Sequence, residues 1–338
     1  MDNTADSCDV AIIGAGPVGL FAVFECGMLE MGCHLFDALP ASGGQCAALY
    51  PEKPIYDIPG YPRIGAAELV DRLLEQARPF APAFHLGHPV CGLAATEAGF
   101  VVENLAGRRV AARAVVIAAG AGAFGPNRPP LAGIAEFEGR SVFYLVGRRE
   151  DFRGRRVVIA GGGDSAVDWA LSLAEIAERV IVVHRRDRFR AAPQSAAQLQ
   201  RLADEGRIEL VIPYQLHALE GDSGQLSAVI VADLAGGMRR LAADCLLPFF
   251  GLATDLGPLA SWEIALDDNR ISVDPATCAT SRPGIFAIGD IALYPGKLKL
   301  ILSGFAEAAQ AAHAIHPLVH PGEALHFEYS TTKGVPGR

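Results

Sequence analysis

The chain has 338 residues, of which 51% are hydrophobic and 20% are charged, and its formal net charge at pH 7 is −9. This length predicts two domains, and the composition is typical of a soluble globular protein with a large core, which excludes disordered, collagen-like and small disulfide-stabilised chains. The negative charge argues against nucleic acid as the main partner.

The segment Met1–Asp9 is polar and acidic, so it lacks the pattern of a signal peptide, and no apolar run reaches the roughly 18 residues of a membrane-spanning helix. Seven cysteines are scattered along the chain, and none stands in C-x-x-C spacing. An odd number of such thiols without an export signal indicates a reducing compartment. We therefore expect a cytoplasmic protein with no membrane partner and no metal site.

The first expected element is a β-α-β unit over Asp9–Leu39. An apolar run precedes G-x-G-x-x-G at Gly14, Gly16 and Gly19, and a helical stretch leads to a second apolar run that ends at Asp37. Glycines at this spacing permit a tight turn and the close approach of the backbone to a pyrophosphate at the helix N-terminus. The carboxylate of Asp37 can accept hydrogen bonds from ribose hydroxyls and would repel a 2′-phosphate.

The next expected elements are strands at Gly99–Asn104 and Val110–Ala118, followed by the Gly/Pro-rich Gly120–Pro130, which indicates passage out of the first domain. A second β-α-β unit over Arg156–Arg186 then repeats the first. It carries G-x-G-x-x-A at Gly161, Gly163 and Ala166.

The second unit differs from the first at the end of its second strand. His184 replaces the acidic residue and is followed by four arginines: Arg185, Arg186, Arg188 and Arg190. One guanidinium group can donate two parallel hydrogen bonds to the oxygens of a phosphate. This site is therefore expected to hold a 2′-phosphorylated nucleotide, NADP(H). A solvated basic loop is the alternative.

Three further strands are expected at Ile208–Ile212, Leu226–Ala232 and Cys245–Phe249, and Phe250–Pro258 is expected to return the chain to the first domain. The second β-α-β unit is therefore inserted into the first domain, in an α/β fold.

A last strand at Ile285–Ile288 ends in Gly289-Asp290. This ending can lay the backbone under a ligand and direct one carboxylate at a sugar hydroxyl. A structural turn aspartate is the alternative. Ser303–Glu307 then leads into an alanine-rich helix whose N-terminus can face an electron-rich ring edge.

These motifs resemble the two-dinucleotide flavoproteins and, more narrowly, the thioredoxin-reductase-like ferredoxin/flavodoxin–NADP+ reductases. The strings that carry the resemblance span about residues 9 to 332 and include IIGAGPVGL, GGQ, YPEKPIYDIPGYP, GGGDSAVDWAL, HRRDRFRA, FAIGD and YST. The resemblance implies two Rossmann-like three-layer dinucleotide-binding domains, with the NADP domain inserted into the FAD domain. Residues 1–122 and 250–338 would bind FAD, with the tail 316–338 covering the flavin, and residues 123–249 would bind NADP(H).

The resemblance also implies the residues that hold the two cofactors. The implied FAD contacts are Gly14, Gly16, Gly19, Asp37, Gln45, Tyr50, Val90, Phe124, Asp290 and Thr331. The implied NADP(H) contacts are Gly161, Gly163, Asp164, Ser165, His184, Arg185, Arg186 and Arg190.

Two tyrosines are implied to act at the flavin. Tyr50 would stack on one face of the isoalloxazine ring and Tyr329 on the other, with Tyr329 supplied by the partner subunit of a homodimer. Because the Pro/His-rich stretch His316–His326 gives little reason for a core helix, it is expected to belong to this tail.

The implied activity is electron exchange between NADP(H) and ferredoxin or flavodoxin, by hydride transfer to flavin N5 and single-electron release. Cys46 stands at the first position of a C-x4-C dithiol, but Pro51 occupies the second, so electrons are expected to leave the flavin directly. A peroxidase-like role for Cys46 stays open, as does reduction of another acceptor (quinone, oxygen or a thioredoxin-like protein) or a non-enzymatic flavin-binding role.

An acidic electron carrier favours a basic docking face. The candidate cations for that face are Arg148, Arg149, Arg153, Arg155, Arg156, Lys297 and Lys299. Ordinary solvated surface charge is the alternative for each of them.

Overall fold

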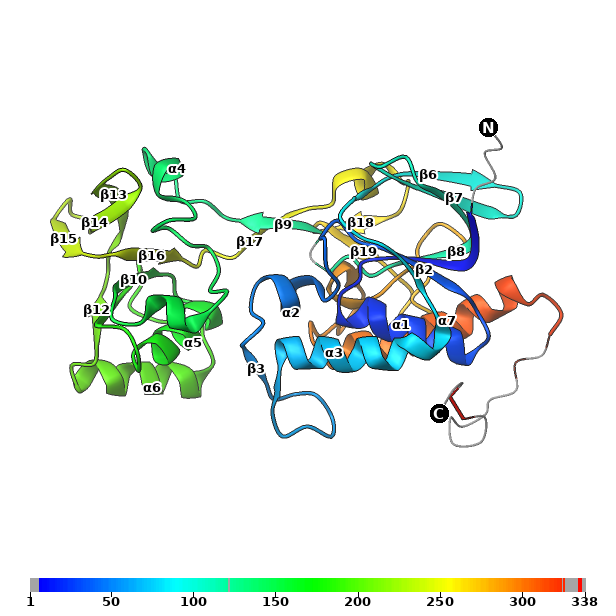
Figure 1. Cartoon of the computed structure of the whole chain (residues 1–338), viewed down its shortest axis with the longest axis horizontal. Helices are drawn as coiled ribbons and strands as arrows, with labels where there is room; N and C mark the ends of the chain where they lie inside the picture. The colour runs from blue at the N-terminus through cyan, green and yellow to red at the C-terminus, as the bar shows by residue number, and fades with distance from the viewer. Residues whose placement is uncertain (1–5, 121, 324, 326–333, 336–338) are drawn as a thin grey trace. The chain divides into compact units, whose positions relative to one another are not determined.

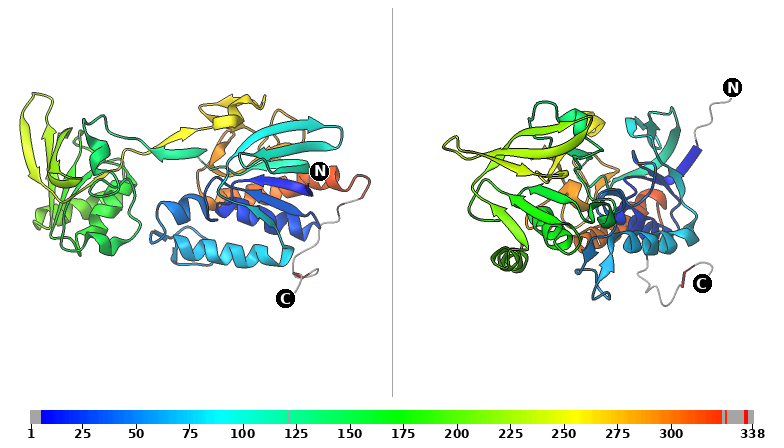
Figure 2. Two further views of the ribbon diagram at one scale, coloured as in Figure 1. Left: turned by 45° about the horizontal axis from the view of Figure 1, so that its top comes forward. Right: turned by 60° about the vertical axis from the view of Figure 1, so that its left-hand side comes forward.

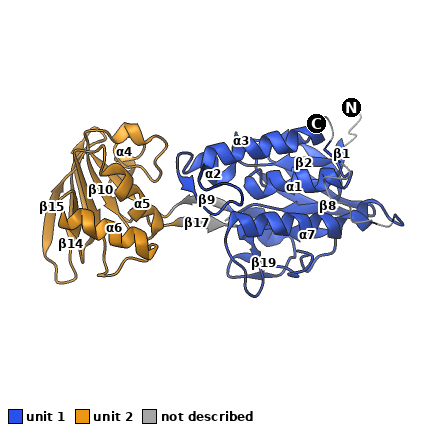
Figure 3. Cartoon of the chain, turned by 90° about the horizontal axis from the view of Figure 1, so that it is seen from below, with its two compact units in different colours: residues 1–124, 254–338 blue, residues 125–253 orange. Residues whose placement is uncertain are grey.

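The computed structural model describes residues 6–120, 122–323, 325 and 334–335. The chain divides into two compact units: unit 1, Met1–Phe124 with Thr254–Arg338, and unit 2, Gly125–Ala253 (Figures 1 and 3). It passes between them through β9 (Ala123–Pro126) and β17 (Leu252–Asp255), which pair with each other. Both segments that were expected to carry the chain between the domains thus contain a short strand, and the pairing of the two strands satisfies backbone groups of both.

Unit 1 contains the N-terminal β-α-β repeat. Its helices are α1 (Pro17–Met28), α2 (Gly44–Ala48), α3 (Ala66–Ala77), α7 (Ile301–Val319) and the 3-10 turns η1 (Arg78–Phe80), η3 (Gly257–Ser261) and η4 (Gly289–Ile291). Its strands are β1 (Asp6–Ile13), β2 (Cys33–Phe36), β3 (Pro54–Ile55), β4 (Ile64–Gly65), β5 (Ala83–His85), β6 (Val90–Thr96), β7 (Gly99–Asn104), β8 (Arg109–Ile117), β18 (Leu266–Asp267), β19 (Arg270–Ser272), β20 (Ile285–Ala287) and β21 (Ala292–Leu293).

The main sheet of unit 1 has the strand order β5-β2-β1-β8-β7-β6, and β20 also pairs with β8. Strands β5, β2, β1, β8 and β20 run parallel, whereas β6 and β7 are antiparallel. The first part of β8 pairs with β7 and its last residues pair with β20. Helices α1, α3 and α7 lie on one side of this sheet (Figures 1 and 2).

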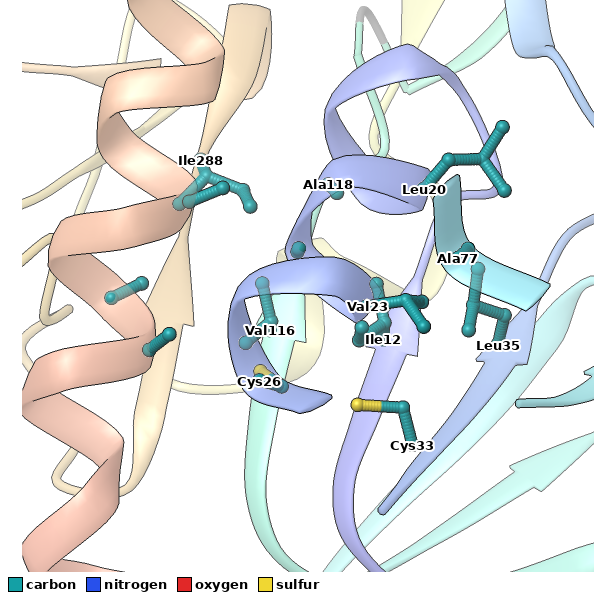
Figure 4. Close-up of a cluster of buried hydrophobic side chains, with 14 of the residues drawn as sticks. Ile12, Leu20, Val23, Cys26, Cys33, Leu35, Ala77, Val116, Ala118 and Ile288 are labelled. Carbon is teal, nitrogen blue, oxygen red and sulfur yellow. The ribbon is translucent and has the colours of Figure 1, made fainter. Parts of the chain in front are cut away.

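Strand β1 shows why the first β-α-β unit begins with a continuous apolar run. Val10 and Ile12 pack in the helix-side core, and Ala11 and Ile13 pack in the core on the opposite face. Because successive side chains of a strand point to opposite faces, burial on both faces requires every position to be apolar. Figure 4 shows Ile12 beside side chains of α1 and the neighbouring strands.

Unit 2 repeats the same architecture. Its helices are α4 (Ile134–Phe137), η2 (Arg149–Phe152), α5 (Asp164–Leu173) and α6 (Pro193–Asp204), and its strands are β10 (Arg156–Ala160), β11 (Arg179–Val183), β12 (Ile208–Val211), β13 (Gln215–Asp222), β14 (Gln225–Ala232), β15 (Met238–Ala242) and β16 (Cys245–Pro248). A parallel sheet of order β12-β11-β10-β16 is covered by α5 and α6 on one face, and the antiparallel sheet β13-β14-β15 supplies the core on the other. Both units are thus three-layered and Rossmann-like.

The expected strands are confirmed, with ends that differ by at most one residue: Gly99–Asn104, Val110–Ala118, Ile208–Ile212, Leu226–Ala232, Cys245–Phe249 and Ile285–Ile288. The expectation for the start of the C-terminal tail is wrong. Helix α7 includes His316 and Pro317 and ends at Val319. Proline in the last turn removes only one hydrogen bond, and the burial of Ile315, His316 and Val319 favours the helix.

None of the helices in the described part of the chain combines the length and hydropathy that crossing a membrane requires.

Candidate cofactor sites

A cavity of about 330 Å³ lies in unit 1 at the carboxyl ends of its parallel strands. Residues at the ends of β1, β2, β8 and β20 line it, together with α2 and the start of α7. Its volume is within the range of ligand pockets, and this edge of a parallel sheet is where open α/β folds bind ligands.

The glycine turn after β1 forms one wall of the cavity. Gly14 has φ +114°, and a Cβ atom there would lie 2.2 Å from the carbonyl oxygen of Ala118. A Cβ atom on Gly19 would lie 1.9 Å from the carbonyl oxygen of Gly14. These two glycines therefore let the turn pack closely against β8 and α1. Gly16 lines the cavity and has no side chain to fill it, so the turn presents bare backbone to a ligand.

Asp37 follows β2 at the edge of the cavity. Its carboxylate accepts the backbone N–H of Ala15 at 2.7 Å and that of Leu39 at 2.8 Å. Burial raises the pKa of Asp37, and backbone N–H donors, including those of Leu39 and Ala15, oppose the rise. Each oxygen keeps a lone pair beyond its backbone hydrogen bond, so the fixed carboxylate retains acceptors for a sugar hydroxyl.

Helix α2 and the residues after it form a second wall. Gln45, Cys46 and Tyr50 all line the cavity. Cys46 is 3% exposed, and burial raises the pKa of its thiol to about 11, although a hydrogen bond from Tyr50 opposes the rise. Burial also raises the pKa of Tyr50. Cys46 is therefore protonated near neutral pH and is poorly suited to attack as a thiolate.

The third wall joins the end of β20 to the start of α7. Gly289 and Asp290 line the cavity here, as do Leu300 and Ile301. Helix α7 begins at Ile301 without a side-chain hydrogen bond at its N-cap, and its first turn contains no acidic residue. The N–H groups and the positive end of the helix dipole at this terminus favour a ligand edge that carries partial negative charge.

Most of the residues implied for FAD come together at this cavity. Its lining includes Gly14, Gly16, Asp37, Gln45, Tyr50, Val90 and Asp290. Gly19 does not line the cavity, and its role is to allow the close approach of α1 to the Gly14 carbonyl group. Phe124 lies in β9, but its side chain is not among those described, and Tyr329 and Thr331 fall outside the described residues.

Several cavity residues were not among those implied by the sequence. They are mainly apolar and include Pro89, Leu259, Trp262, Leu300 and Ile301. Apolar residues of this kind carry no sequence signal that separates a cofactor wall from an ordinary core, so only their place in the fold identifies them.

Unit 2 has an equivalent glycine turn after β10. A Cβ atom on Gly161 would lie 2.7 Å from the carbonyl oxygen of Phe249, and Gly163 is the N-cap of α5, with open space where its Cβ would be. Asp164 and Ser165 begin α5, and the Asp164 carboxylate accepts the backbone N–H of Ala192 at 2.8 Å. The turn therefore leaves backbone N–H groups at a helix N-terminus, a common site for phosphate.

The His184 ring packs against this turn at Gly162. His184 is 8% exposed, and its ring stacks on Phe189 with 5.1 Å between centroids. A Cβ atom on Gly162 would lie 2.2 Å from the ring. Burial lowers the pKa of His184, and the positive charges of nearby arginines lower it further, while a hydrogen bond with the Arg188 carbonyl opposes this. The neutral imidazole thus has a packing role in addition to its implied contact with NADP(H).

The arginines after His184 lie on the surface. Arg185, Arg186 and Arg190 are exposed, and no carboxylate among the described residues forms an ion pair with them. The backbone N–H of Arg190 donates to the carbonyl oxygen of Gly162 at 2.7 Å, which ties the basic segment to the glycine turn. Three guanidinium groups are therefore available to an anionic ligand beside this turn.

The expected basic docking face is weaker than its residue count suggests. Arg149, Arg153 and Arg156 each form an ion pair, with Glu175, Glu150 and Asp244 respectively. These carboxylates offset the charge that an acidic carrier would meet.

The expectation that Lys297 belongs to a docking face is wrong. Its side chain is 1% exposed and forms a buried ion pair with Glu307. Lys299 is exposed, and it alone of the two lysines stays available to a partner.

Within the described residues, no group of three or more His, Cys, Asp or Glu side chains is placed to hold a metal ion.

Comparison with known proteins places the chain in a family. Residues 8–315 match the family model described as pyridine nucleotide-disulphide oxidoreductase. A ferredoxin–NADP reductase of Paramagnetospirillum magneticum is 65% identical over 97% of this chain and 98% of its own length. A ferredoxin–NADP reductase of Rhodospirillum rubrum is 63% identical over 97% of this chain and 96% of its own length.

Solved structures of thioredoxin reductases share the fold. The enzyme of Lactococcus lactis, described as the FR conformation, has a TM-score of 0.79 and 26% identity, covering 92% of this chain and 99% of that one. The enzyme of T. acidophilum has a TM-score of 0.80 and 23% identity, covering 92% of this chain and 98% of that one.

Alkylation tests the protonated, buried state of Cys46. Because its pKa is about 11, only about one thiol in a thousand is ionised at pH 8, and iodoacetamide should label it at least a hundredfold more slowly than the exposed Cys91. Its labelling rate should rise about tenfold per pH unit from pH 8 to pH 10. Mass spectrometry of tryptic peptides, with C46S as the peptide control, measures both rates, and equal labelling of Cys46 and Cys91 at pH 8 would contradict the burial.

Proposed function

The chain belongs to the pyridine nucleotide-disulphide oxidoreductase family and, within it, to the ferredoxin–NADP reductases, and we propose that the cavity of unit 1 binds FAD while the basic glycine turn of unit 2 binds NADP(H). It is an oxidoreductase that exchanges electrons between NADP(H) and ferredoxin or flavodoxin. One observation carries the assignment of the two sites. After the second strand of the repeat, unit 1 has the carboxylate of Asp37, whereas unit 2 has exposed arginines between Arg185 and Arg190.

The residues of unit 1 fit FAD. Gly16 presents backbone where a side chain would fill the turn, and the fixed carboxylate of Asp37 can bind a ribose. Tyr50 provides an aromatic ring in the cavity, and the N-terminus of α7 provides N–H donors. When bound, FAD accepts two electrons as a hydride and releases them singly, which is the conversion that a one-electron carrier requires.

The residues of unit 2 fit the 2′-phosphate of NADP(H). Arg185, Arg186 and Arg190 lie beside the turn and have no acidic partner among the described residues. We assign the pyrophosphate to the N–H groups at the start of α5, near Gly163, Asp164 and Ser165, where the helix dipole favours negative charge. The proposed catalytic contribution of the two sites is to bind the nucleotides so that the nicotinamide can be positioned against the flavin.

Electrons are proposed to leave the flavin without an internal dithiol. All seven cysteines are free, and Cys46, which lines the cavity, is buried and protonated. A lone thiol cannot cycle as a dithiol and disulfide. The acceptor therefore takes its electrons from the flavin itself, and ferredoxin is the carrier named for the relatives.

We extend the proposal to assembly and location. The chain forms a homodimer in which Tyr329 and Thr331 of the tail reach the flavin of the partner subunit. These residues lie outside the described part, and their assignment is supported by the YST string of the sequence. Location in the cytoplasm is supported by the seven free cysteines.

Stopped-flow spectroscopy tests the function and the nucleotide site together. NADPH should bleach the visible flavin band, and reduced flavin should be reoxidised when oxidised ferredoxin is added. NADH should act with a kcat/KM at least tenfold lower. In Arg185→Ala or Arg186→Ala the kcat/KM for NADPH should fall about 10- to 100-fold, corresponding to about 1.5–3 kcal/mol of lost phosphate contact, while that for NADH should stay within about twofold.

Arg207→Ala is the matched control, because Arg207 is an exposed arginine of unit 2 between α6 and β12, at the amino ends of the strands. It should leave both nucleotides unaffected. Equal kcat/KM values for NADPH and NADH in the parent chain would refute the nucleotide assignment, and bleaching without reoxidation by ferredoxin would refute the acceptor.

A truncation tests the proposed tail. A chain that ends at Phe327 should keep FAD bound but should change the rate of flavin reduction by NADPH and the rate of reoxidation by oxygen, because a stacked tyrosine gates and shields the ring. Tyr329→Ala should shift the visible flavin band, whereas Tyr329→Phe should not. If the truncated and full-length proteins agree in spectrum and in both rates, the tail does not lie at the flavin.

A further inference from the structure

Unit 1 contains a buried ion pair between Lys297 and Glu307. The two side chains are 1% and 2% exposed. In every other ion pair found among the described residues, at least one side chain is 35% exposed or more. Removing two charges from water is costly, and replacement of such a pair by apolar residues is often neutral or stabilising. Overall stability therefore does not explain this pair.

Both oxygens of the Glu307 carboxylate accept hydrogen bonds. One oxygen, Oε1, accepts hydrogen bonds from the Tyr294 hydroxyl at 2.7 Å and from the Lys297 ammonium group. The other, Oε2, accepts the backbone N–H of Gly289 at 2.7 Å. The Lys297 nitrogen also lies 5.4 Å from the centroid of the Tyr294 ring. Two side chains thus fix the carboxylate through Oε1, and Oε2 in turn fixes the backbone N–H of Gly289.

This carboxylate joins the two segments that form one wall of the cavity. Gly289 and Asp290 in η4 line the cavity, and so do Leu300 and Ile301 at the start of α7. Glu307 lies about two turns inside α7, so its bond to Gly289 fixes the position of η4 relative to the helix start.

Val18 packs against both segments, and most tightly against α7 at Gly304. A Cβ atom on Gly304 would lie 2.4 Å from Val18 Cγ2, and one on Gly289 would lie 3.6 Å from the same side chain. Helix α7, η4 and the start of α1 therefore meet at Val18, which also lines the cavity. A small shift of η4 would displace the carboxylate of Asp290 relative to the cofactor.

We propose that Glu307, held by Lys297 and Tyr294, is a positioning residue that fixes Gly289–Asp290 and the start of α7 for flavin binding. The proposal rests on the assignment of FAD to the cavity of unit 1. Glu307 acts through the Gly289 N–H and does not itself line the cavity.

Two neutral double variants separate positioning from charge. In Lys297→Met/Glu307→Gln, the amide oxygen can still accept the Gly289 N–H. In Lys297→Met/Glu307→Leu, the volume is similar and the charges are again removed, but Gly289 loses its acceptor. We expect the Gln variant to bind FAD within about threefold of the parent, and the Leu variant at least tenfold more weakly, with a shifted visible flavin band. The fraction of FAD that is free at equilibrium after serial dilution of the holoprotein, measured by flavin fluorescence, gives the dissociation constant. Thermal unfolding of each apoprotein gives its stability.

Equal FAD affinity and equal spectra of the two double variants would overturn the proposal, whatever their thermal stability. Should the Leu variant fail to fold, Tyr294→Phe provides the test, with FAD binding expected to weaken at least threefold and a change below 1.5-fold counting against it. Asp244→Asn, which breaks the Arg156–Asp244 pair of unit 2, should leave FAD binding unchanged. A parent chain that binds no FAD would refute the proposed function itself, a result distinct from any difference between the variants.

Discussion

The central parallel strands of each unit are buried on both faces, and this burial determines where the chain can meet a ligand. In β1 and in β10, alternate residues enter the cores on opposite sides, so both faces of these parallel strands are covered. A ligand can therefore reach them at the strand ends. At the carboxyl ends of β1 and β10 the chain turns sharply into a helix, and the glycines there expose backbone N–H groups at a helix N-terminus. The same constraint therefore places a glycine turn and an uncapped helix N-terminus in both units, where we propose that phosphate binds.

The two sites differ through the residues after the second strand. In unit 1, Asp37 is fixed by the N–H groups of Ala15 and Leu39, and its charge disfavours a 2′-phosphate. In unit 2, the equivalent place is taken by His184, which is neutral and packed under Gly162, so that the arginines that follow are held beside the turn but remain exposed. The proposed difference in specificity between the two sites therefore rests on a short segment of sequence.

Sequence reasoning succeeded where burial forces a continuous pattern. The central strands were predicted within one residue because burial on both faces makes each a run of apolar residues. Strands β6, β13 and β15 were not predicted, since they are half-exposed and their alternation is interrupted. The helix through Pro317 was not predicted either, because tertiary burial of Ile315 and Val319 overrides the local signal. Lys297 and Glu307 look like surface residues in the sequence, and only the fold shows that they are buried together.

Hydrogen exchange measured by mass spectrometry tests the separate assignment of the two sites most directly. When NADP+ is added to the FAD-loaded protein, amides in peptides spanning 161–166 and 184–190 should become protected, while those spanning 14–19 should not change. When FAD is removed, exchange should accelerate in peptides spanning 14–19 and 289–301. Protection of 14–19 by NADP+, or no protection at 161–166 and 184–190, would contradict the account.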